Sequence, residues 1–96
     1  MSYEGYKQGR HKSKGGLIRS FVRLEGNKIK DIEFSGDFFL FPESAIESIV
    51  ESLKDAVADY DSVLSAVQSV YESELITAPG TSPEDFAASI MQAIES

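Results

Sequence analysis

The sequence contains no cysteine and a single histidine, and none of its apolar runs approaches the roughly 20 residues that cross a membrane. Without cysteine the chain cannot build a disulfide framework, a thiolate metal site or a thiol nucleophile. The first residues also lack the apolar core of a signal peptide. We therefore expect a cytoplasmic protein with no membrane contact.

Catalytic and metal-binding patterns are equally scarce. The one histidine, His11, lies in a basic segment, and a Ser-His-Asp triad would have to recruit it. We expect it to be solvated or to make a minor partner contact. Asp59-Tyr60-Asp61 lacks the glycine and the distal glutamate of a calcium loop, so it indicates a helix cap. The sequence therefore predicts no catalytic residue and no metal site in this chain.

The chain does have enough apolar content for one modest core. Its 96 residues are 42% hydrophobic and include six phenylalanines and four tyrosines, which predicts a single domain over residues 1–96. Charge is uneven: residues 1–30 hold eight basic and two acidic side chains, whereas residues 31–96 hold one basic and fourteen acidic. This polarity either orients the domain on a partner or phosphorylated ligand, or lets basic strands neutralise acidic helices.

Strand patterns occupy the first part of the chain. Residues 1–9 are polar and are expected to be flexible, although residues 10–14 have the composition of a sheet edge. Residues 17–24 and 29–35 alternate as strands and flank Gly26-Asn27, which predicts a hairpin.

Two registers are open for this hairpin. A two-residue type II′ loop pairs Val22 with Asp31, whereas a three-residue loop pairs Val22 with Ile32 and Arg23 with Asp31. We prefer the second, realised through a bulge, because it sorts charged and apolar side chains better.

A short third strand over residues 38–41 and three helices are expected to follow. The first helix runs from Pro42 to about Lys54, with Ser44 and Glu47 as an alternative capping box. Asp59 or Asp61 caps the second helix, and the sequence Ser82-Pro83-Glu84-Asp85 opens the third. The fold class is therefore α+β, a small antiparallel sheet (hairpin plus short third strand) followed by three helices packed mainly on one face.

Four large apolar residues in a row are the most informative feature. In an extended segment Phe38 and Leu40 face one way while Phe39 and Phe41 face the other. A phenylalanine brings roughly 150–250 Å² of surface, so an outward pair approaches the size at which exposed patches indicate a partner. Two interpretations stay open: burial of both faces within the domain, or a partner interface.

Lys12 and Lys14, with Gly15-Gly16, give the one phosphate-like signal, because two cations and a glycine pair can present N–H groups to an anion. The pattern is neither a Walker loop nor a dinucleotide fingerprint, since a strand follows it. Both lysines are weak candidates for a nucleotide contact. The other interpretation is a bend that positions a basic edge.

Three segments together resemble the C-terminal accessory domain of lipoate–protein ligase, and more closely the separately encoded accessory subunit of two-piece archaeal ligases: Lys14-Gly15-Gly16-Leu17-Ile18-Arg19, Lys30-Asp31-Ile32 and Ser35-Gly36-Asp37-Phe38-Phe39-Leu40-Phe41-Pro42-Glu43. The family commonly ends its first helix with glycine, where Asp55-Ala56-Val57-Ala58 stands here, so that boundary is open. We expect the partner interface at Gly15, Gly16, Leu17, Gly36, Asp37, Phe38, Phe39 and Phe41.

The resemblance implies that a catalytic large subunit holds lipoate, ATP and magnesium, and that this chain alone binds none of them. The chain would form a heterodimer with that subunit and would be inactive alone. It would be needed for activating lipoate to lipoyl-AMP, and less needed for transfer to a lysine of the acceptor protein. The alternative is a free-standing adaptor unrelated to lipoylation. Nucleic-acid binding is not expected, because such domains present a basic face throughout.

Overall fold

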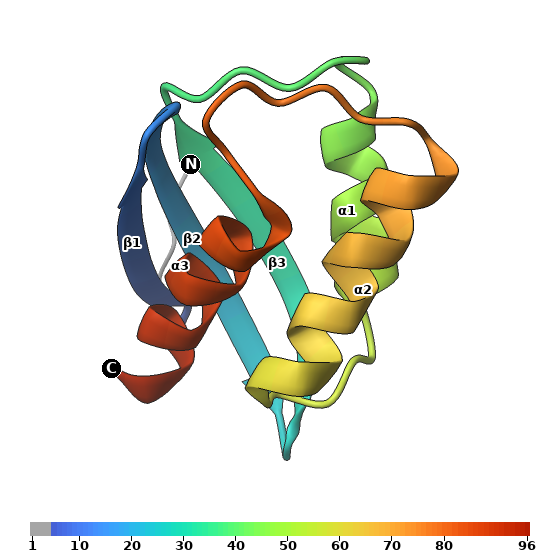
Figure 1. Ribbon diagram of the computed structural model, residues 1–96. Coiled ribbons are helices and arrows are strands. Elements are labelled where there is room, and N and C mark those ends of the chain that lie inside the picture. The colour runs from blue at the N-terminus through green and yellow to red at the C-terminus, as the bar shows by residue number, and fades with distance from the viewer. Residues whose placement is uncertain (1–4) are drawn as a thin grey trace.

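The computed structural model describes residues 5–96 as a three-stranded antiparallel sheet followed by three helices, so the predicted α+β class is confirmed (Figure 1). The elements, in chain order, are β1 (Lys7–Ser13), β2 (Gly16–Glu25), β3 (Lys28–Gly36), α1 (Ala45–Leu53), α2 (Tyr60–Ser73) and α3 (Pro83–Glu95). Helix α3 lies over β1 and β2, α1 lies beside β3, and α2 packs between α1 and α3.

The β2–β3 hairpin uses the predicted pairing of Val22 with Ile32 and Arg23 with Asp31. The turn itself has only two residues, Gly26-Asn27, and Gly26 adopts φ 61° as the first position of a type II′ turn requires. A register shift after Arg23 reconciles the two features. The tight turn and the bulge therefore coexist, and the bulge restores the pairing that places apolar side chains on one face.

The third strand is β1, and its position corrects the sequence prediction. Residues 38–41 make one isolated bridge, Phe41 with Thr77, and no strand. Strand β1 pairs along β2 from Lys7 with Val22 to Ser13 with Gly16, so residues 7–9, placed in a flexible segment, are part of the sheet. The predicted flexibility of residues 1–4 lies outside the described residues.

Helices α2 and α3 start at the predicted caps. The Asp59 carboxylate accepts a hydrogen bond from the Ser62 amide at 2.7 Å, and Ser82 forms a complete capping box with Asp85. Helix α1 differs from the prediction: it begins at Ala45, and the Ser44 side chain makes no capping bond. Residues 42–44 form a turn instead, which follows a cis Phe41–Pro42 peptide bond.

Phe86 is the centre of the core. It is fully buried on α3, and its ring makes edge-to-face contacts with Phe34, Phe38 and Tyr71 at centroid distances of 5.3, 5.3 and 6.4 Å. These partners come from β3, the β3–α1 connection and α2, so one ring ties the sheet to the helical layer. Within the described residues no helix is both long and apolar enough to cross a membrane.

Candidate functional site

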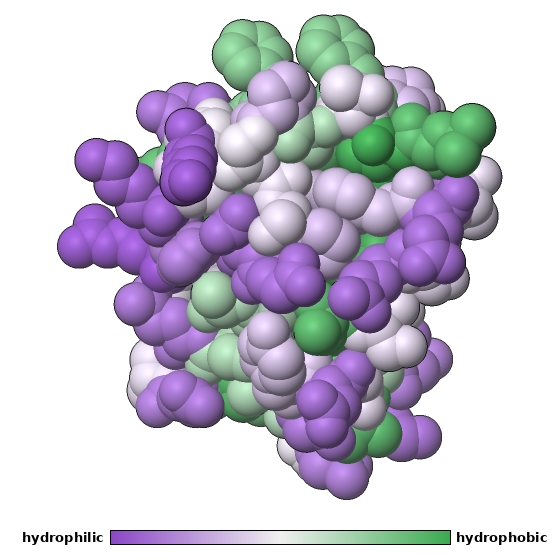
Figure 2. Space-filling model, viewed as in Figure 1, coloured by the Kyte–Doolittle hydropathy of each residue, from purple (hydrophilic) through white to green (hydrophobic). Residues whose placement is uncertain are grey.

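Three large apolar side chains are exposed at one end of the molecule. Phe39, Phe41 and Leu75 are 67%, 53% and 83% exposed, and we call these three residues the apolar end. Figure 2 shows apolar side chains at the top and upper right of the view, where the β3–α1 and α2–α3 connections run in Figure 1. Water-exposed aromatic rings gathered at one end indicate a contact surface for another molecule.

The segment before α1 alternates as predicted. Leu40 is buried and Phe38 packs edge-to-face on Phe86, whereas Phe39 and Phe41 point outward. The domain therefore encloses one face of the segment and leaves the other open. Phe38, which the sequence prediction also placed in the partner interface, is partly buried against the core, and its contact with a partner stays a prediction.

Three connections meet at this end. The Phe41 amide donates to the Thr77 carbonyl at 2.8 Å, and the Thr77 amide donates back to Phe41 at 2.8 Å. The Gly15 amide donates to the Gly80 carbonyl at 3.0 Å, so the β1–β2 turn reaches the α2–α3 connection. These backbone bonds fix the positions from which Phe39 and Phe41 project.

Asp37 clamps the end of β3 to the start of β2. Its carboxylate accepts a hydrogen bond from the Leu17 amide at 2.5 Å, and its own amide donates to the Leu17 carbonyl at 3.1 Å. Gly36 adopts φ 141° and Gly16 φ 133°, and a Cβ on Gly36 would lie 1.9 Å from the Leu17 oxygen. The four residues thus have a structural role in aiming the aromatic segment. Their contact with a partner stays a prediction.

Replacing Gly36 with alanine is expected to lower the free energy of unfolding by about 3 kcal/mol, because a left-handed alanine and a backbone clash are combined. The matched control is Gly26→Ala, which also has positive φ but open space around its Cβ position. It should cost about 1 kcal/mol. Urea unfolding measures both, and equal losses would mean that the close approach to Leu17 has no energetic weight.

Sequence reasoning missed Leu75. It lies four residues after Tyr71, so helical spacing places it on the apolar stripe of α2. The structure ends α2 at Ser73 and puts Leu75 in the left-handed region at φ 50°, where its side chain turns to solvent. A leucine at positive φ costs roughly 1–2 kcal/mol, and such strained residues cluster at functional surfaces.

Lys12 and Lys14 are exposed beside a hollow of about 470 Å³ at the start of α3. Asp85 also lines this hollow, and its carboxylate already accepts bonds from the Ser82 amide at 2.9 Å and from His11 Nε2 at 2.8 Å. An anion entering here would meet that carboxylate as well as the two cations. The nucleotide contact of Lys12 and Lys14 therefore stays a prediction, and the Asp85 carboxylate beside these lysines would oppose it.

Hydrogen bonding controls the ionisation of Asp85. Burial raises the pKa of this carboxyl, but the bonds from Ser82 and His11 outweigh burial and hold the pKa below its ordinary value. A carboxylate with a lowered folded-state pKa stabilises the fold above its unfolded pKa of about 3.9 and loses that contribution as pH falls further.

Asp85→Asn is therefore expected to lower stability at neutral pH and to make the urea midpoint less sensitive to pH below about 4. The control is Asp61→Asn, which removes an exposed carboxylate from the first turn of α2. It should keep the acid sensitivity of the parent chain. A parent-like acid response in Asp85→Asn would contradict the assignment.

Basic side chains collect on the open face of the sheet. Arg10, Lys12, Arg19 and Arg23 are exposed there, and Arg10 lies directly opposite Arg19 in the β1–β2 ladder. Like charges directly opposite each other are unfavourable in an isolated sheet, so the β1–β2 part of this face suits an anionic neighbour, whereas on its β3 side Asp31 lies opposite Arg23. The acidic side chains lie mainly on the helices and on β3.

The described residues bring together no group of three or more histidine, aspartate or glutamate side chains that could hold a metal ion. His11 pairs with Asp85 and bridges β1 to α3, which is a structural contact.

Comparisons with known proteins agree on one family. Residues 4–90 match the family described as "Bacterial lipoate protein ligase C-terminus". The protein named lipoate-protein ligase A subunit 2 of Thermoplasma acidophilum is 43% identical over 75 residues, which are 78% of this chain and 77% of that protein. A solved chain from a structural analysis of an archaeal lipoylation system, a bi-partite lipoate protein ligase and its E2 lipoyl domain from Thermoplasma acidophilum, has a TM-score of 0.80 at 35% identity. That match covers 88% of this chain and 93% of the solved chain.

Proposed function

Since the chain belongs to the family of lipoate protein ligase C-termini, we propose that it is a non-catalytic accessory subunit of a two-part ligase. It docks on the large catalytic subunit as a heterodimer and is required for the ATP-dependent conversion of lipoate to lipoyl-AMP. Transfer to a lysine of the acceptor protein follows. The naming of a relative as subunit 2, and a structural relative from a bi-partite ligase, support this assignment.

The apolar end is the observation that carries the docking proposal. Phe39 and Phe41 expose more than half of their surface, although burying a phenylalanine is worth roughly 1.5–3 kcal/mol. The same segment buries Leu40 and half-buries Phe38, so the domain encloses two of its apolar side chains and leaves the other two in water. A docked large subunit would bury the exposed pair at the centre of an interface, where aromatic residues contribute most.

Docking explains how a subunit without catalytic groups supports adenylation. ATP, magnesium and lipoate are held by the large subunit in this proposal. Their reaction joins a carboxylate to a phosphate, and it benefits from excluded water and from positive potential. A docked domain excludes water by covering the site. The paired arginines of the open sheet face, Arg10 and Arg19, are the positive groups that this chain contributes.

The test is reconstitution from separate parts. The purified large subunit is incubated with ATP, magnesium and lipoate, with and without this chain, and lipoyl-AMP is measured. We expect its formation to depend on the added chain. Equal adenylation with and without the chain would overturn the proposal and would favour a free-standing adaptor.

A further inference from the structure

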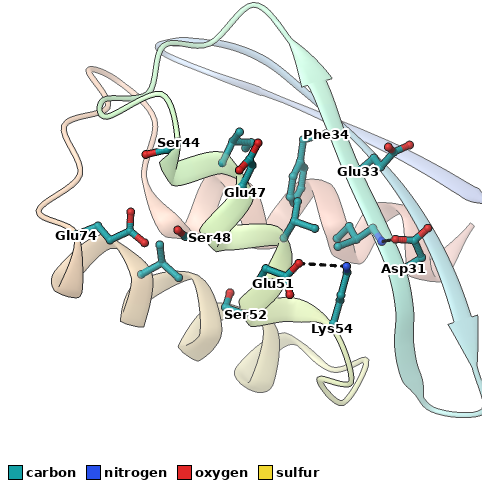
Figure 3. Close-up of a pocket in the computed structure, with 14 residues that line it drawn as sticks. Asp31, Glu33, Phe34, Ser44, Glu47, Ser48, Glu51, Ser52, Lys54 and Glu74 are labelled. Atoms are coloured by element: carbon teal, nitrogen blue, oxygen red, sulfur yellow. Dashed lines mark hydrogen bonds and ion pairs between the residues drawn. The ribbon is translucent and has the colours of Figure 1, made fainter.

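A second surface lies on the side of the molecule, in the groove between β3 and α1. The groove has a volume of about 970 Å³ and is lined by Asp31 to Phe34 of β3 and by the outer face of α1. Figure 3 shows the Phe34 ring between β3 and α1, with Glu47 and Glu51 on the helix. The lining also includes Val70 and Glu74 at the end of α2, so the groove reaches the residue before Leu75, but it contains neither Phe39 nor Phe41 of the apolar end.

The outer edge of β3 is open along this groove. At its start, Ile29 exchanges backbone bonds with Asp55 and Ala56, at 2.8 and 2.9 Å. Beyond that point the Ile32 amide donates to its neighbour's side chain, Asp31 Oδ1, at 3.0 Å. In an antiparallel strand every second residue directs its N–H and C=O to the same edge, so Phe34 presents its backbone there too. No other described element pairs with this stretch.

The side chains around this edge are sorted by face. Ile32, Phe34, Ile46 and Val50 supply an apolar lining on the helix side. Asp31 and Glu33 point away from α1 (Figure 3), and the cross-strand partner of Glu33 is Phe21.

On the helix, Glu47 and Glu51 line the same groove. Lys54 is the one basic residue in its lining, and its ammonium is paired with Glu51 at 3.3 Å. Asp31 lies opposite Arg23 in the β2–β3 ladder and accepts a hydrogen bond from the Tyr6 hydroxyl. The carboxylates of the lining still outnumber its one ammonium, so the groove offers apolar surface with a net negative rim.

We propose that this groove binds an extended segment of a partner chain in which apolar and basic residues alternate. Its backbone pairs with Phe34 and with Ile32 of β3, where a carbonyl of the partner replaces the Asp31 carboxylate on the Ile32 amide. Its apolar side chains lie on Ile46 and Val50, while its basic side chains meet Asp31 and Glu33 on the opposite face. Such strand addition combines main-chain hydrogen bonds for affinity with alternate side chains for specificity. The proposal goes beyond the accessory role and does not depend on it.

A second copy of this chain is a poor occupant of the same edge. Antiparallel pairing of β3 with β3 would bring Asp31 and Glu33 of one copy beside those of the other, and like charges across strands are unfavourable. Charged residues on edge strands commonly prevent self-pairing in this way. The acidic rim therefore selects a basic, different partner.

The test uses a peptide of about eight residues, a length typical of one strand, in which valine and lysine alternate and both termini are capped. Two control peptides are matched to it: one has the same composition with valines and lysines in separate blocks, and the other alternates valine with glutamate. Binding is followed by nuclear magnetic resonance of the full chain. We expect only the alternating valine–lysine peptide to shift the Ile32 and Phe34 amide signals and to slow hydrogen exchange at Phe34.

Two charge-reversal variants complete the test. Glu33→Lys with Glu47→Lys should weaken peptide binding roughly tenfold or more. The control, Glu72→Lys with Glu95→Lys, changes the net charge equally at exposed sites on α2 and α3, and should bind like the parent chain.

The proposal would be overturned if the control peptide with separate valine and lysine blocks bound as well as the alternating one, or if no peptide bound. Equal weakening of binding in both charge-reversal variants would also overturn it. So would concentration-dependent pairing of β3 in the absence of peptide, because the edge would then belong to a second copy.

Discussion

The double variant Phe39→Asp with Phe41→Asp is expected to abolish co-elution of the chain with the large subunit of lipoate protein ligase. Interface aromatics that become fully buried contribute about 2 kcal/mol or more each, so losing two weakens binding by roughly a thousandfold. The introduced carboxylates would also have to be desolvated on docking. Lipoyl-AMP formation should fall with the complex.

The fold itself should tolerate this double change. Both rings are more than half exposed, so their removal takes little apolar area from the core. Unfolding by urea should give a midpoint close to that of the parent chain. That result separates lost docking from lost structure.

A matched control exists at the opposite end of the molecule. Val57 and Tyr60 are 38% and 43% exposed, near the β2–β3 turn, where the Ala58 amide donates to the Asn27 carbonyl. Val57→Asp with Tyr60→Asp introduces the same charge and should leave co-elution intact. If this control abolishes the complex while the phenylalanine variant keeps it, docking occurs at the other end.

Several features of this fold could be predicted because they depend on interactions between residues that are close in the sequence. The pairing of Val22 with Ile32 follows from matching apolar side chains across the hairpin, and the cap at Ser82 follows from side chains that satisfy free amides. The outward direction of Phe39 and Phe41 follows from the alternation of an extended segment around a buried Leu40.

Other features depend on contacts that the sequence pattern does not express. The sequence predicts flexibility for residues 7–9 and gives only residues 10–14 the composition of a sheet edge, but the whole of residues 7–13 pairs with β2 and lies beneath α3, where the Arg10 amide donates to Gln92. Leu75 matches the helical stripe, yet the helix ends before it. Residues 38–41 do not join the sheet, because the one bridge in this segment pairs Phe41 with Thr77 of the α2–α3 connection.

The proposed partner interface shows the same division. Its exposed rings were visible in the sequence as an apolar run on two faces. The clamp of Asp37 on Leu17 was not visible, because it depends on the approach of two segments twenty residues apart in the chain. The motif that carries the family resemblance thus contains residues that face outward, Phe39 and Phe41, together with residues that have a structural role, such as Gly36 and Asp37.

Phe86→Ala is expected to cost about 3–5 kcal/mol of unfolding free energy, which is a large part of the roughly 5–15 kcal/mol available to a small domain. The ring is fully buried and contacts Phe34, Phe38 and Tyr71, so its removal leaves a cavity bordered by three aromatic side chains. Thermal and urea unfolding measure the loss. A change below about 1 kcal/mol would mean that the surrounding rings collapse into the space.

The same variant tests whether the core controls docking. Phe38 rests on Phe86 and belongs to the same short segment as the exposed Phe39 and Phe41, so loosening Phe38 should disorder the segment that carries both rings. Under conditions where Phe86→Ala remains mostly folded, binding to the large subunit should still be weakened, whereas Phe39→Ala should weaken binding with little change in stability. If the folded fraction of Phe86→Ala binds as tightly as the parent chain, the aromatic segment is held by the Asp37 clamp and the Thr77 bridge alone.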